Sequence, residues 1–419
     1  MKKVCVIGSG MVGVSCALNL LEKQYQVTLL ERHETTIETS YGNAGVITRS
    51  SALLLNNKTL IPNLKHYLFN QHPAVRLSYP YILKNLKWAL GFLKQSPACF
   101  SEKNIKSLDS LIKVSLDEHL KWMQKSNQTD RLRDTGWLKL YRSKASMQSN
   151  GYEKAIYDEL GIAYRELDSQ ALQDLEPALA PIYTGALLIQ DAASVNNPGA
   201  LVEGYKKLFI ESGGQLVQDD VQQLIELQGD STSSVLVKGK QADYSADYVV
   251  IAAGPWSNDI LQSIARPLPM GFERGYHEHY EIPVDAPHHL TRPVYDVEEA
   301  FVMTPTSLGY RLTSGSEIKD KAAPASPVQL QAIRHAANQA VSLGPLKPQS
   351  DWQGSRPTLV DSLPAIGKCP GTSHIWLAFG HQHVGFSTGP ATGRLLAELI
   401  HNETPYIDAT PFNPARFTS

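Results

Sequence analysis

Residues 4–13 read VCVIGSGMVG, an apolar run followed at once by three spaced glycines. The residues after them suit a helix, and residues 26–31, QVTLLE, form a second apolar run that ends in a carboxylate. The order predicted from this pattern is strand, glycine turn, helix and strand. That order is typical of the unit that binds a dinucleotide in doubly wound α/β folds.

Each glycine has its own physical role in such a turn. Gly8 permits the tight bend, Gly10 lets the backbone approach a pyrophosphate, and Gly13 lets the helix pack closely on the strand. Free N–H groups at the helix start then point at the phosphates. Glu31 stands where a carboxylate accepts a hydrogen bond from a ribose 2′-hydroxyl, and its charge would repel a 2′-phosphate. We therefore predict a bound dinucleotide, either NAD or FAD, and not a merely structural turn.

Length and composition limit the classes of protein that remain. A chain of 419 residues exceeds one ordinary hydrophobic core, so two domains are expected. The 42% hydrophobic and 19% charged content is typical of a soluble globular enzyme. Because 39 Lys and Arg nearly balance 41 Asp and Glu, with no long basic run, we expect no nucleic-acid partner.

The first residues imitate a signal peptide, since Met1, Lys2 and Lys3 precede an apolar run. Removal of a signal peptide would discard the glycine turn and the helix after it, and no clean small-residue cleavage site precedes the second strand, so we expect a cytoplasmic protein. No apolar stretch approaches the roughly 20 residues that span a bilayer. The cysteines lack metal-ligand spacing and are predicted to be reduced, buried thiols; they are Cys5, Cys16, Cys99 and Cys369.

Residues 59–125 are predicted to be mainly helical, and they contain an amphipathic stretch with lysines beside an apolar stripe. Such a helix either lies on a membrane surface or packs on the protein's own core. We favour the core, which is the commoner reason for a stripe. The stripe is Ile82, Leu83, Leu86, Ala89, Leu90 and Leu93, and the lysines off it are Lys84, Lys87 and Lys94.

Further elements follow from periodicity and from turn residues. Strands are predicted at 137–141, 217–227, 234–238, 248–254, 275–282, 300–304, 309–313 and 375–379, and helices at 144–160, 198–212, 328–343 and 385–401. Segments typical of the nucleotide-binding domain occur again after residue 185 and after residue 353, separated by segments of a different kind. The sequence therefore predicts a mixed α/β fold, in which a Rossmann-like domain is interleaved with an antiparallel-sheet domain.

Four motifs in order carry a resemblance to a known family. They are the glycine turn with Glu31, the loop 39–45, the run 252–257 (AAGPWS), and a C-terminal block from Arg356-Pro357 to 381–385 (HQHVG). Together they resemble the D-amino-acid oxidase family of flavin-dependent oxidoreductases over nearly the whole chain. Within it the chain is most similar to bacterial D-amino-acid dehydrogenases (small subunit) and D-hydroxyproline dehydrogenases.

The resemblance implies FAD and a division of the chain into two domains. The FAD-binding domain would comprise 1–90, 185–265 and 345–419, and the substrate domain 91–184 and 266–344. Gly354 and Gly42 stand where relatives attach flavin covalently, so a dissociable FAD is expected. The cofactor-binding residues implied are Gly8, Gly10, Met11, Val12, Gly13, Glu31, Arg32, Ser40, Asn43, Ala44, Gly45, Val46, Val221, Ala253, Gly254, Trp256, Gly380, His383, Val384, Gly385, Phe386 and Ser387.

For the substrate, the resemblance implies a carboxylate held by the fork of the Arg356 guanidinium, a geometry that suits arginine better than lysine. The alternative is a surface arginine. Tyr276 and His383 are predicted to line the same pocket. Arg311, on a predicted strand, would either orient a carboxylate or be a solvated charge. The pairs at 277/279 and 381/383 are read as ordinary polar histidines, and no metal is expected.

The implied reaction is hydride transfer from the substrate Cα to the flavin N5, with a D-amino acid as substrate, cyclic ones such as D-hydroxyproline included. Two alternatives stay open. One is oxidation of glycine, sarcosine or an L-imino acid on the same scaffold, and the other is a non-catalytic flavin subunit of a heteromeric dehydrogenase. The expected electron acceptor is oxygen or a membrane quinone. Contact with the inner face of the cell membrane is an alternative to a wholly cytoplasmic location.

Overall fold

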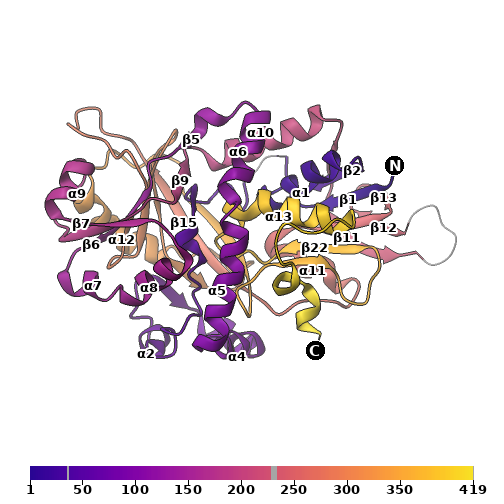
Figure 1. Ribbon diagram of the computed structural model, residues 1–419, viewed down its shortest axis with the longest axis horizontal. Helices are drawn as coiled ribbons and strands as arrows, with labels where there is room; N and C mark the ends of the chain where they lie inside the picture. The colour runs from indigo at the N-terminus through magenta and orange to yellow at the C-terminus, as the bar shows by residue number, and fades with distance from the viewer. Residues whose placement is uncertain (35–36, 228–233, 419) are drawn as a thin grey trace.

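A computed structural model describes residues 1–34, 37–227 and 234–418. Two large sheets dominate it, one at the right and one at the left of Figure 1, with helices packed over and between them. The predicted mixed α/β class is confirmed.

The right-hand sheet assembles strands from both ends of the chain. Its order is β10-β2-β1-β14-β22-β21, and only the edge strand β21 runs antiparallel to its neighbour. This is the doubly wound arrangement that the glycine turn predicts. The strands are β1 (Lys3–Ile7), β2 (Gln26–Glu31), β10 (Gln215–Gln218), β14 (Tyr248–Ile251), β21 (Ala365–Lys368) and β22 (Ile375–Phe379).

Both faces of this sheet are covered, as the continuous apolar strands require. Because successive side chains of a strand point to opposite faces, Val4 and Val6 join the core beneath the helices α1 (Met11–Glu22), α10 (Pro198–Glu211) and α13 (Gly385–Ile400). Cys5 and Ile7 join a second core on the other face. That face is covered by β11 (Val221–Glu226), β12 (Val235–Gly239), β13 (Asp243–Ala246) and α11 (Ser257–Gln262).

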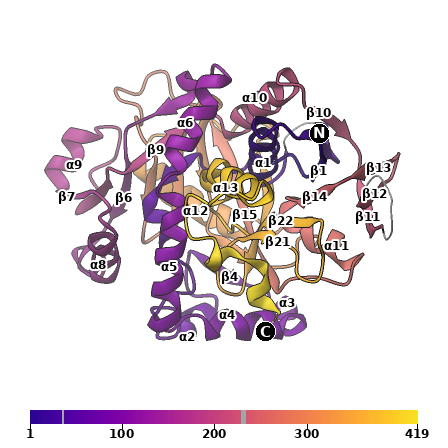
Figure 2. The ribbon, with the colours of Figure 1, turned by 45° about the vertical axis from the view of Figure 1, so that its right-hand side comes forward.

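Helices α1 and α13 lie side by side because α13 carries glycine at the contact (Figure 2). A Cβ at Gly389 would lie 2.6 Å from Cγ of Met11, and one at Gly393 would lie 2.5 Å from the backbone of Ser15. The first and last α-helices of the chain therefore pack directly against each other.

The left-hand sheet has ten strands in the order β4-β19-β15-β18-β17-β16-β6-β8-β7, and β20 pairs with β15. A further small sheet has the order β3-β9-β5. The strands are β3 (Val46–Thr48), β4 (Val75–Leu77), β5 (Leu132–Arg133), β6 (Trp137–Tyr141), β7 (Tyr164–Asp168), β8 (Gly185–Ile189), β9 (Ala192–Val195), β15 (Met270–Tyr280), β16 (Val294–Asp296), β17 (Phe301–Thr306), β18 (Gly309–Thr313), β19 (Ser316–Ile318) and β20 (Trp352–Leu359).

Several elements differ from the sequence-based expectation. The single helix predicted over 144–160 is two helices, α7 (Lys144–Gln148) and α8 (Gly151–Leu160), and several short strands were not predicted. The domain ranges remain a prediction. By hydrogen bonding, β8 and β20 belong to the left-hand sheet although they fall in ranges given to the FAD-binding domain. Helices α5 (Ala98–Ile112) and α6 (Ser115–Lys125) pack against α13.

Ile82 and Ala89 pack on a small buried cluster, as predicted, but the amphipathic stripe as a whole does not. It spans α3 (Tyr79–Lys84) and α4 (Leu86–Lys94), and Leu83, Leu86 and Leu90 are exposed, so their predicted packing on the core is wrong. Trp88, which lies off the stripe, turns inward instead. The prediction that all four cysteines are buried also fails at Cys99, which is exposed. Within the described ranges, no helix is both long and apolar enough to cross a membrane.

Candidate active site

A cavity of about 700 Å³ extends between the two large sheets. One end lies at the carboxyl ends of β1, β2, β14 and β22, where ligands bind in doubly wound folds. The other end reaches β16 to β19 of the left-hand sheet. Every residue predicted for the cofactor lines this cavity except three: Gly13, Gly45 and Val384.

The glycine turn has the geometry that its sequence predicts. Gly8 has a φ of +99°, and a Cβ there would lie 2.7 Å from the carbonyl oxygen of Ala252. A Cβ at Gly13 would lie 1.7 Å from the carbonyl oxygen of Gly8, so only glycine lets α1 approach the turn. Gly10 precedes the first residue of α1, whose backbone N donates to Oγ of Ser40 (3.0 Å), and the start of the helix faces the cavity.

Glu31 is held in place at the end of β2 by backbone and hydroxyl donors. Its Oε2 accepts hydrogen bonds from Ser9 N (2.9 Å) and Ser9 Oγ (2.8 Å), and its Oε1 accepts one from Arg32 N (2.8 Å). The Arg32 guanidinium lies 3.6 Å from the centre of the Trp256 ring, a cation–π contact. This end of the cavity therefore presents a fixed carboxylate, a helix start and a flat cationic surface.

Arg311 has a role that neither sequence-based interpretation gave it. The side chain is fully buried, and it donates to the carbonyl oxygens of Tyr41 (3.0 Å) and Asn43 and to Nε2 of His279 (3.1 Å). Burial lowers the pKa of this guanidinium to about 10. It is neither solvated nor part of the cavity wall. It attaches the loop at 39–45 to β18 of the left-hand sheet.

We expect Arg311→Met to loosen that loop. Each buried carbonyl left without a donor costs about 1–3 kcal/mol, so the melting temperature should fall and the expected FAD should dissociate about 10- to 100-fold more readily. Flavin absorbance retained after gel filtration measures this. The matched control is Arg334→Met, whose half-exposed side chain pairs with Glu278 of β15. Equal retention by both variants would contradict the assigned role.

Arg356 stands on β20 directly opposite Glu273 of β15. Its Nη1 donates to Oγ of Ser316 (2.9 Å), and Ser316 Oγ donates to Oε2 of Glu273 (3.4 Å). A Cβ at Gly275 would lie 2.5 Å from Nη2, so this glycine makes room for the guanidinium. Oγ1 of Thr358 donates to the other oxygen of Glu273 (2.6 Å).

The protein encloses Arg356, yet the guanidinium has surface on the cavity. Burial lowers its pKa and raises the pKa of Glu273, while each charge partly offsets that effect on the other. Within the described chain, no carboxylate lies within ion-pair distance of Arg356. A cation that is enclosed, oriented and unpaired is a site for a small anion.

The charged groups that line the cavity are unevenly distributed. Six gather at the Glu31 end, namely Glu31, Arg32, Glu38, Asp219, Asp220 and Asp259. Toward β16 to β19 the lining is mainly hydroxyl, apolar or aromatic, including Val302, the parallel rings of Trp137 and Tyr295, whose centroids are 6.0 Å apart, and Ser316, which contacts Arg356. These residues were not predicted, because no motif marks them. The chamber suits a molecule with one carboxylate and an apolar body.

Two histidines of the C-terminal turn line the cavity and are neutral at physiological pH. Burial lowers the pKa of His381 to about 3, and burial together with the Arg356 charge lowers that of His383 to about 4. Nε2 of His381 is 3.0 Å from Oγ1 of Thr392. Neither ring adds positive charge that would compete with Arg356 for an anion.

These buried histidines predict a loss of stability in mild acid. The pKa of His119, His279 and His383 is about 4 in the fold and that of His381 about 3, against roughly 6.5 when unfolded. The unfolded chain therefore binds more protons as pH falls from 6.5 toward 4, and stability falls over that window. Urea midpoints at pH 7.5, 5.5 and 4.5 measure this loss of stability.

His381→Gln should reduce the change of unfolding free energy with pH by up to about 1.4 kcal/mol per pH unit. The control His288→Gln, at an exposed position, should leave that change as it is in the parent. Equal pH dependence in the two variants would refute the role given to His381.

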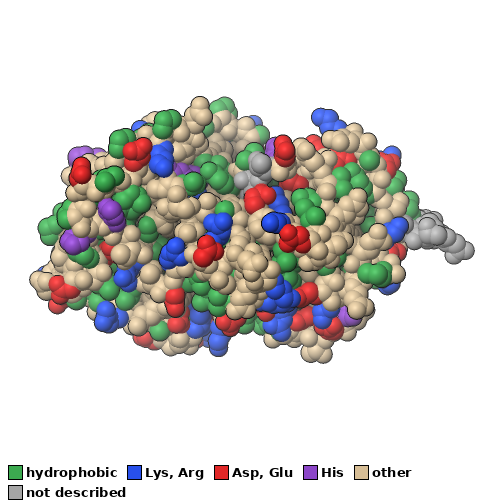
Figure 3. Space-filling model, turned by 90° about the horizontal axis from the view of Figure 1, so that it is seen from above, with side chains coloured by type: hydrophobic (Ala, Val, Ile, Leu, Met, Phe, Trp, Pro, Cys, Tyr) green, Lys and Arg blue, Asp and Glu red, His purple; other side chains and the backbone are tan. Residues whose placement is uncertain are grey.

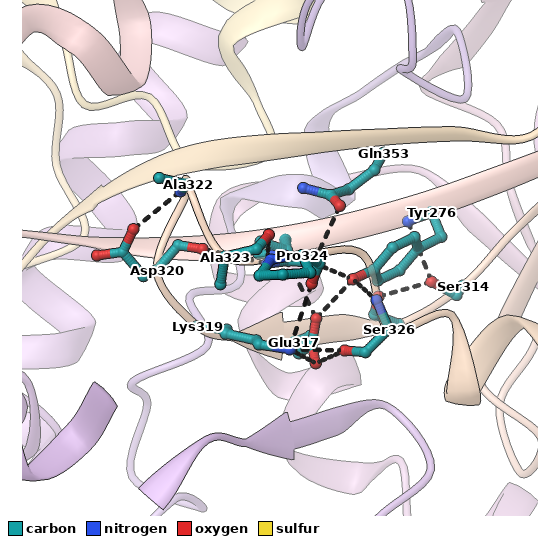
Figure 4. A network of polar contacts seen from close by, with 12 residues as sticks. Tyr276, Ser314, Glu317, Lys319, Asp320, Ala322, Ala323, Pro324, Ser326 and Gln353 are labelled. Atoms are coloured by element: carbon teal, nitrogen blue, oxygen red, sulfur yellow. Dashed lines mark hydrogen bonds and ion pairs between the residues drawn. The ribbon is translucent and has the colours of Figure 1, made fainter. Parts of the chain in front are cut away.

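Tyr276 does not line the cavity, contrary to the prediction. Its hydroxyl donates to Oε2 of Glu317 (2.7 Å) and accepts from the backbone N of Ser326 (3.1 Å), as Figure 4 shows. Buried Arg274 donates to the same hydroxyl (2.5 Å) and to backbone oxygens of Ala323 and Pro324. The network holds the loop before α12 (Val328–Ala340) against β15 and β19, and the Tyr276 side chain is part of it.

Trp352 is another lining residue without a sequence signal. Its ring stacks on His277 with centroids 4.9 Å apart, and its Nε1 donates to the carbonyl oxygen of Ile37 (2.7 Å). A Cβ at Gly42 would lie 1.9 Å from this ring, and one at Gly354 would lie 2.1 Å from it. Among the residues described, no group of three or more His, Cys, Asp or Glu is placed to hold a metal ion.

Comparison with known proteins agrees with this geometry. A family model described as FAD dependent oxidoreductase (DAO) matches residues 3–399. A curated relative named D-amino-acid oxidase, from Bradyrhizobium diazoefficiens, is 28% identical and covers 99% of both chains.

Solved structures share the fold at lower identity. Glycine oxidase from Geobacillus kaustophilus superposes with a TM-score of 0.74 at 19% identity, covering 99% of both chains. L-proline dehydrogenase from P. horikoshii has a TM-score of 0.71 at 17% identity, covering 100% of this chain and 98% of its own.

Proposed function

Because the chain belongs to the DAO family of FAD-dependent oxidoreductases, we propose that it oxidises the Cα–N bond of D-amino acids, cyclic ones such as D-hydroxyproline included. That it is an FAD-dependent oxidoreductase acting on amino-acid CH–NH donors follows from the family and the named relatives. The observation that carries the proposal is Arg356, an enclosed guanidinium without a carboxylate partner among the described residues, at the end of the cavity away from Glu31.

The bound FAD supplies the hydride acceptor. Arg356 holds the substrate carboxylate, and Ser316, which accepts from Nη1, fixes the plane of the fork. A neutral amine then expels the Cα hydride without a dedicated base, which agrees with a chamber whose histidines are neutral. The resulting iminium cation loses a proton to solvent, and the free imine hydrolyses to a 2-oxo acid and ammonia or stays cyclic. Alignment of Cα is the chain's main contribution.

Non-covalent binding of FAD is part of the proposal. The two positions at which relatives attach flavin are glycines, and the Trp352 ring occupies the space beside both. None of the four cysteines belongs to the described lining of the cavity. The loop at 39–45 would lie along the ribityl chain and flavin, and Glu31 would bind the adenosine ribose.

A second substrate class has specific support. The solved neighbours include proteins named glycine oxidase and L-proline dehydrogenase, so glycine, sarcosine or an L-imino acid would fit the same fold. Arg356 would hold the carboxylate of any of these. A non-catalytic flavin subunit would leave that cation without a substrate. The acceptor we propose is oxygen or a membrane quinone, and the location we propose is cytoplasmic.

An anaerobic panel tests the function. Purified holoprotein is mixed with D- and L-amino acids, glycine, sarcosine and hydroxyproline isomers, and flavin bleaching is followed in a stopped-flow instrument. We expect rapid bleaching with D-substrates. Faster bleaching by glycine or L-proline would favour the second class. No bleaching with any member, together with intact flavin absorbance, would leave only the non-catalytic subunit.

A further inference from the structure

Helices α2 (Leu64–Leu68), α3 and α4 expose a cluster of large apolar side chains along one edge of the molecule. Figures 1 and 2 both place α2 and α4 on the lower edge. Leu83 is 67% exposed, and Phe69 and Leu90 are each 63% exposed. We call this surface the basal face; it consists of Ile61, Lys65, Leu68, Phe69, Tyr79, Leu83, Lys84, Leu86, Lys87, Leu90 and Lys94.

The basal face carries positive charge only. The sequence contains no Asp or Glu from residue 39 to residue 101. In the part of the chain that the structure describes, none of the four lysines of the face is within ion-pair distance of a carboxylate. The opposite side of the molecule, seen in Figure 3, mixes Lys and Arg with Asp and Glu. The surface around the exposed leucines therefore differs from the opposite side in carrying basic side chains without acidic ones.

The exposed leucines sit on a rigid support. Trp88, on the inner side of α4, donates from Nε1 to the carbonyl oxygen of Thr358 (2.9 Å). A Cβ at Gly91 would lie 2.9 Å from Cγ1 of Val360, so α4 lies directly on β20 and the residue after it. Because the inner side is fixed in this way, Leu83, Leu86 and Leu90 cannot turn inward without breaking that packing.

From these observations we propose that the basal face docks on an anionic lipid bilayer. Leucines and a phenylalanine interleaved with lysines on short helices have the composition of interfacial anchors: the apolar side chains enter the headgroup boundary while the lysines reach the phosphates. Exposed apolar patches of this kind mark interaction sites.

A second copy of the chain fits this face poorly. A twofold dimer would place the face against itself, so each Lys84, Lys87 and Lys94 would meet a like charge with no carboxylate in the segment to offset it. An anionic bilayer supplies the missing charge and an apolar layer together.

The chain segment that carries the basal face also contributes to the wall of the cavity. Leu55, Ala74 and Val75, from the same acid-free segment, line it, and Leu55 is itself 39% exposed. Docking would therefore involve the same segment that forms this part of the cavity wall. This placement does not depend on which amino acid the protein oxidises, so its test can fail without the proposed function failing.

Vesicle co-sedimentation of the holoprotein tests the proposal. We expect binding to vesicles containing phosphatidylglycerol, at least tenfold weaker binding to pure phosphatidylcholine, and weaker binding at high salt. The variants L83S/L86S/L90S and K84E/K87E/K94E should each bind at least tenfold less. The control I210S/K207E, on exposed positions of α10 at the opposite edge, should bind within twofold of the parent.

Flavin absorbance and far-UV circular dichroism confirm that each variant is folded. Equal binding to neutral and anionic vesicles, equal loss in the control, or no binding at all would overturn the proposal. So would a dimer in vesicle-free solution that the leucine variant dissociates, because the face would then be an interface between copies of the chain.

Discussion

Replacing Arg356 with lysine is expected to lower kcat/KM for the best amino acid about 10²- to 10³-fold, with the flavin spectrum unchanged. Lysine keeps the charge but loses the planar fork, and the Ser316 contact that orients it. This range corresponds to about 3–4 kcal/mol, the loss expected for two charge-assisted hydrogen bonds near the lower end of about 1.5–3 kcal/mol each. Stopped-flow experiments measure the effect on the rate of flavin reduction, and steady-state turnover measures the effect on kcat/KM.

The matched control for that substitution is Arg334→Lys. Arg334 also contacts β15, through Glu278, but it is half-exposed and lies outside the described lining of the cavity. We expect its kcat/KM to stay within about threefold of the parent, the size expected for a surface ion pair. Parental turnover in the Arg356 variant, with full flavin occupancy, would show that the carboxylate binds elsewhere.

Gly13→Ala is expected to abolish FAD retention and to destabilise the fold by more than about 3 kcal/mol, the upper end of ordinary overpacking costs. The new Cβ would lie 1.7 Å from the carbonyl oxygen of Gly8. That atom is backbone, so relief requires α1 to move away from the turn. Gly10→Ala should be milder, because its nearest neighbour is the Ser40 hydroxyl at 3.3 Å.

Gly151→Ala provides the control for a glycine at the start of a helix. Gly151 begins α8, and its added Cβ would meet no atom within 4 Å. We expect stability to change by less than about 1 kcal/mol, in the favourable direction if at all. Flavin occupancy and urea midpoints compare the variants. A folded, FAD-saturated Gly13 variant would show that the turn tolerates a displaced helix.

The sequence predicted the parts of the site that are local. The turn at 8–13 and Glu31 lie within one strand-helix-strand unit, so their spacing alone indicates their arrangement. Arg356 was predicted from the resemblance of its motif. Ser316 and Tyr295 were not, because strands far apart in the sequence bring them to the cavity wall and no local pattern marks them.

Periodicity identified the helical segments, although two of them are each divided into two helices, and it gave an incorrect orientation for one face. The stripe with Leu83 and Leu90 has the spacing of a core-facing surface, yet Trp88 on another side of α4 finds space beside Gly271. The spacing of apolar residues identifies the apolar face of a helix, but it does not show what that face packs against, because tertiary packing determines this. Arg311 shows the same limit, since a charge on a predicted strand appears solvated until the loop that it holds is placed.

The attachment of the loop at 39–45 to Arg311 also has a consequence for synthesis on the ribosome. The Tyr41 carbonyl leaves the exit tunnel 270 residues before the guanidinium that holds it. Although N-terminal units generally fold first during translation, this one would lack its clamp until about three quarters of the chain has been made. Capture of FAD is therefore expected only after about three quarters of the chain has been made.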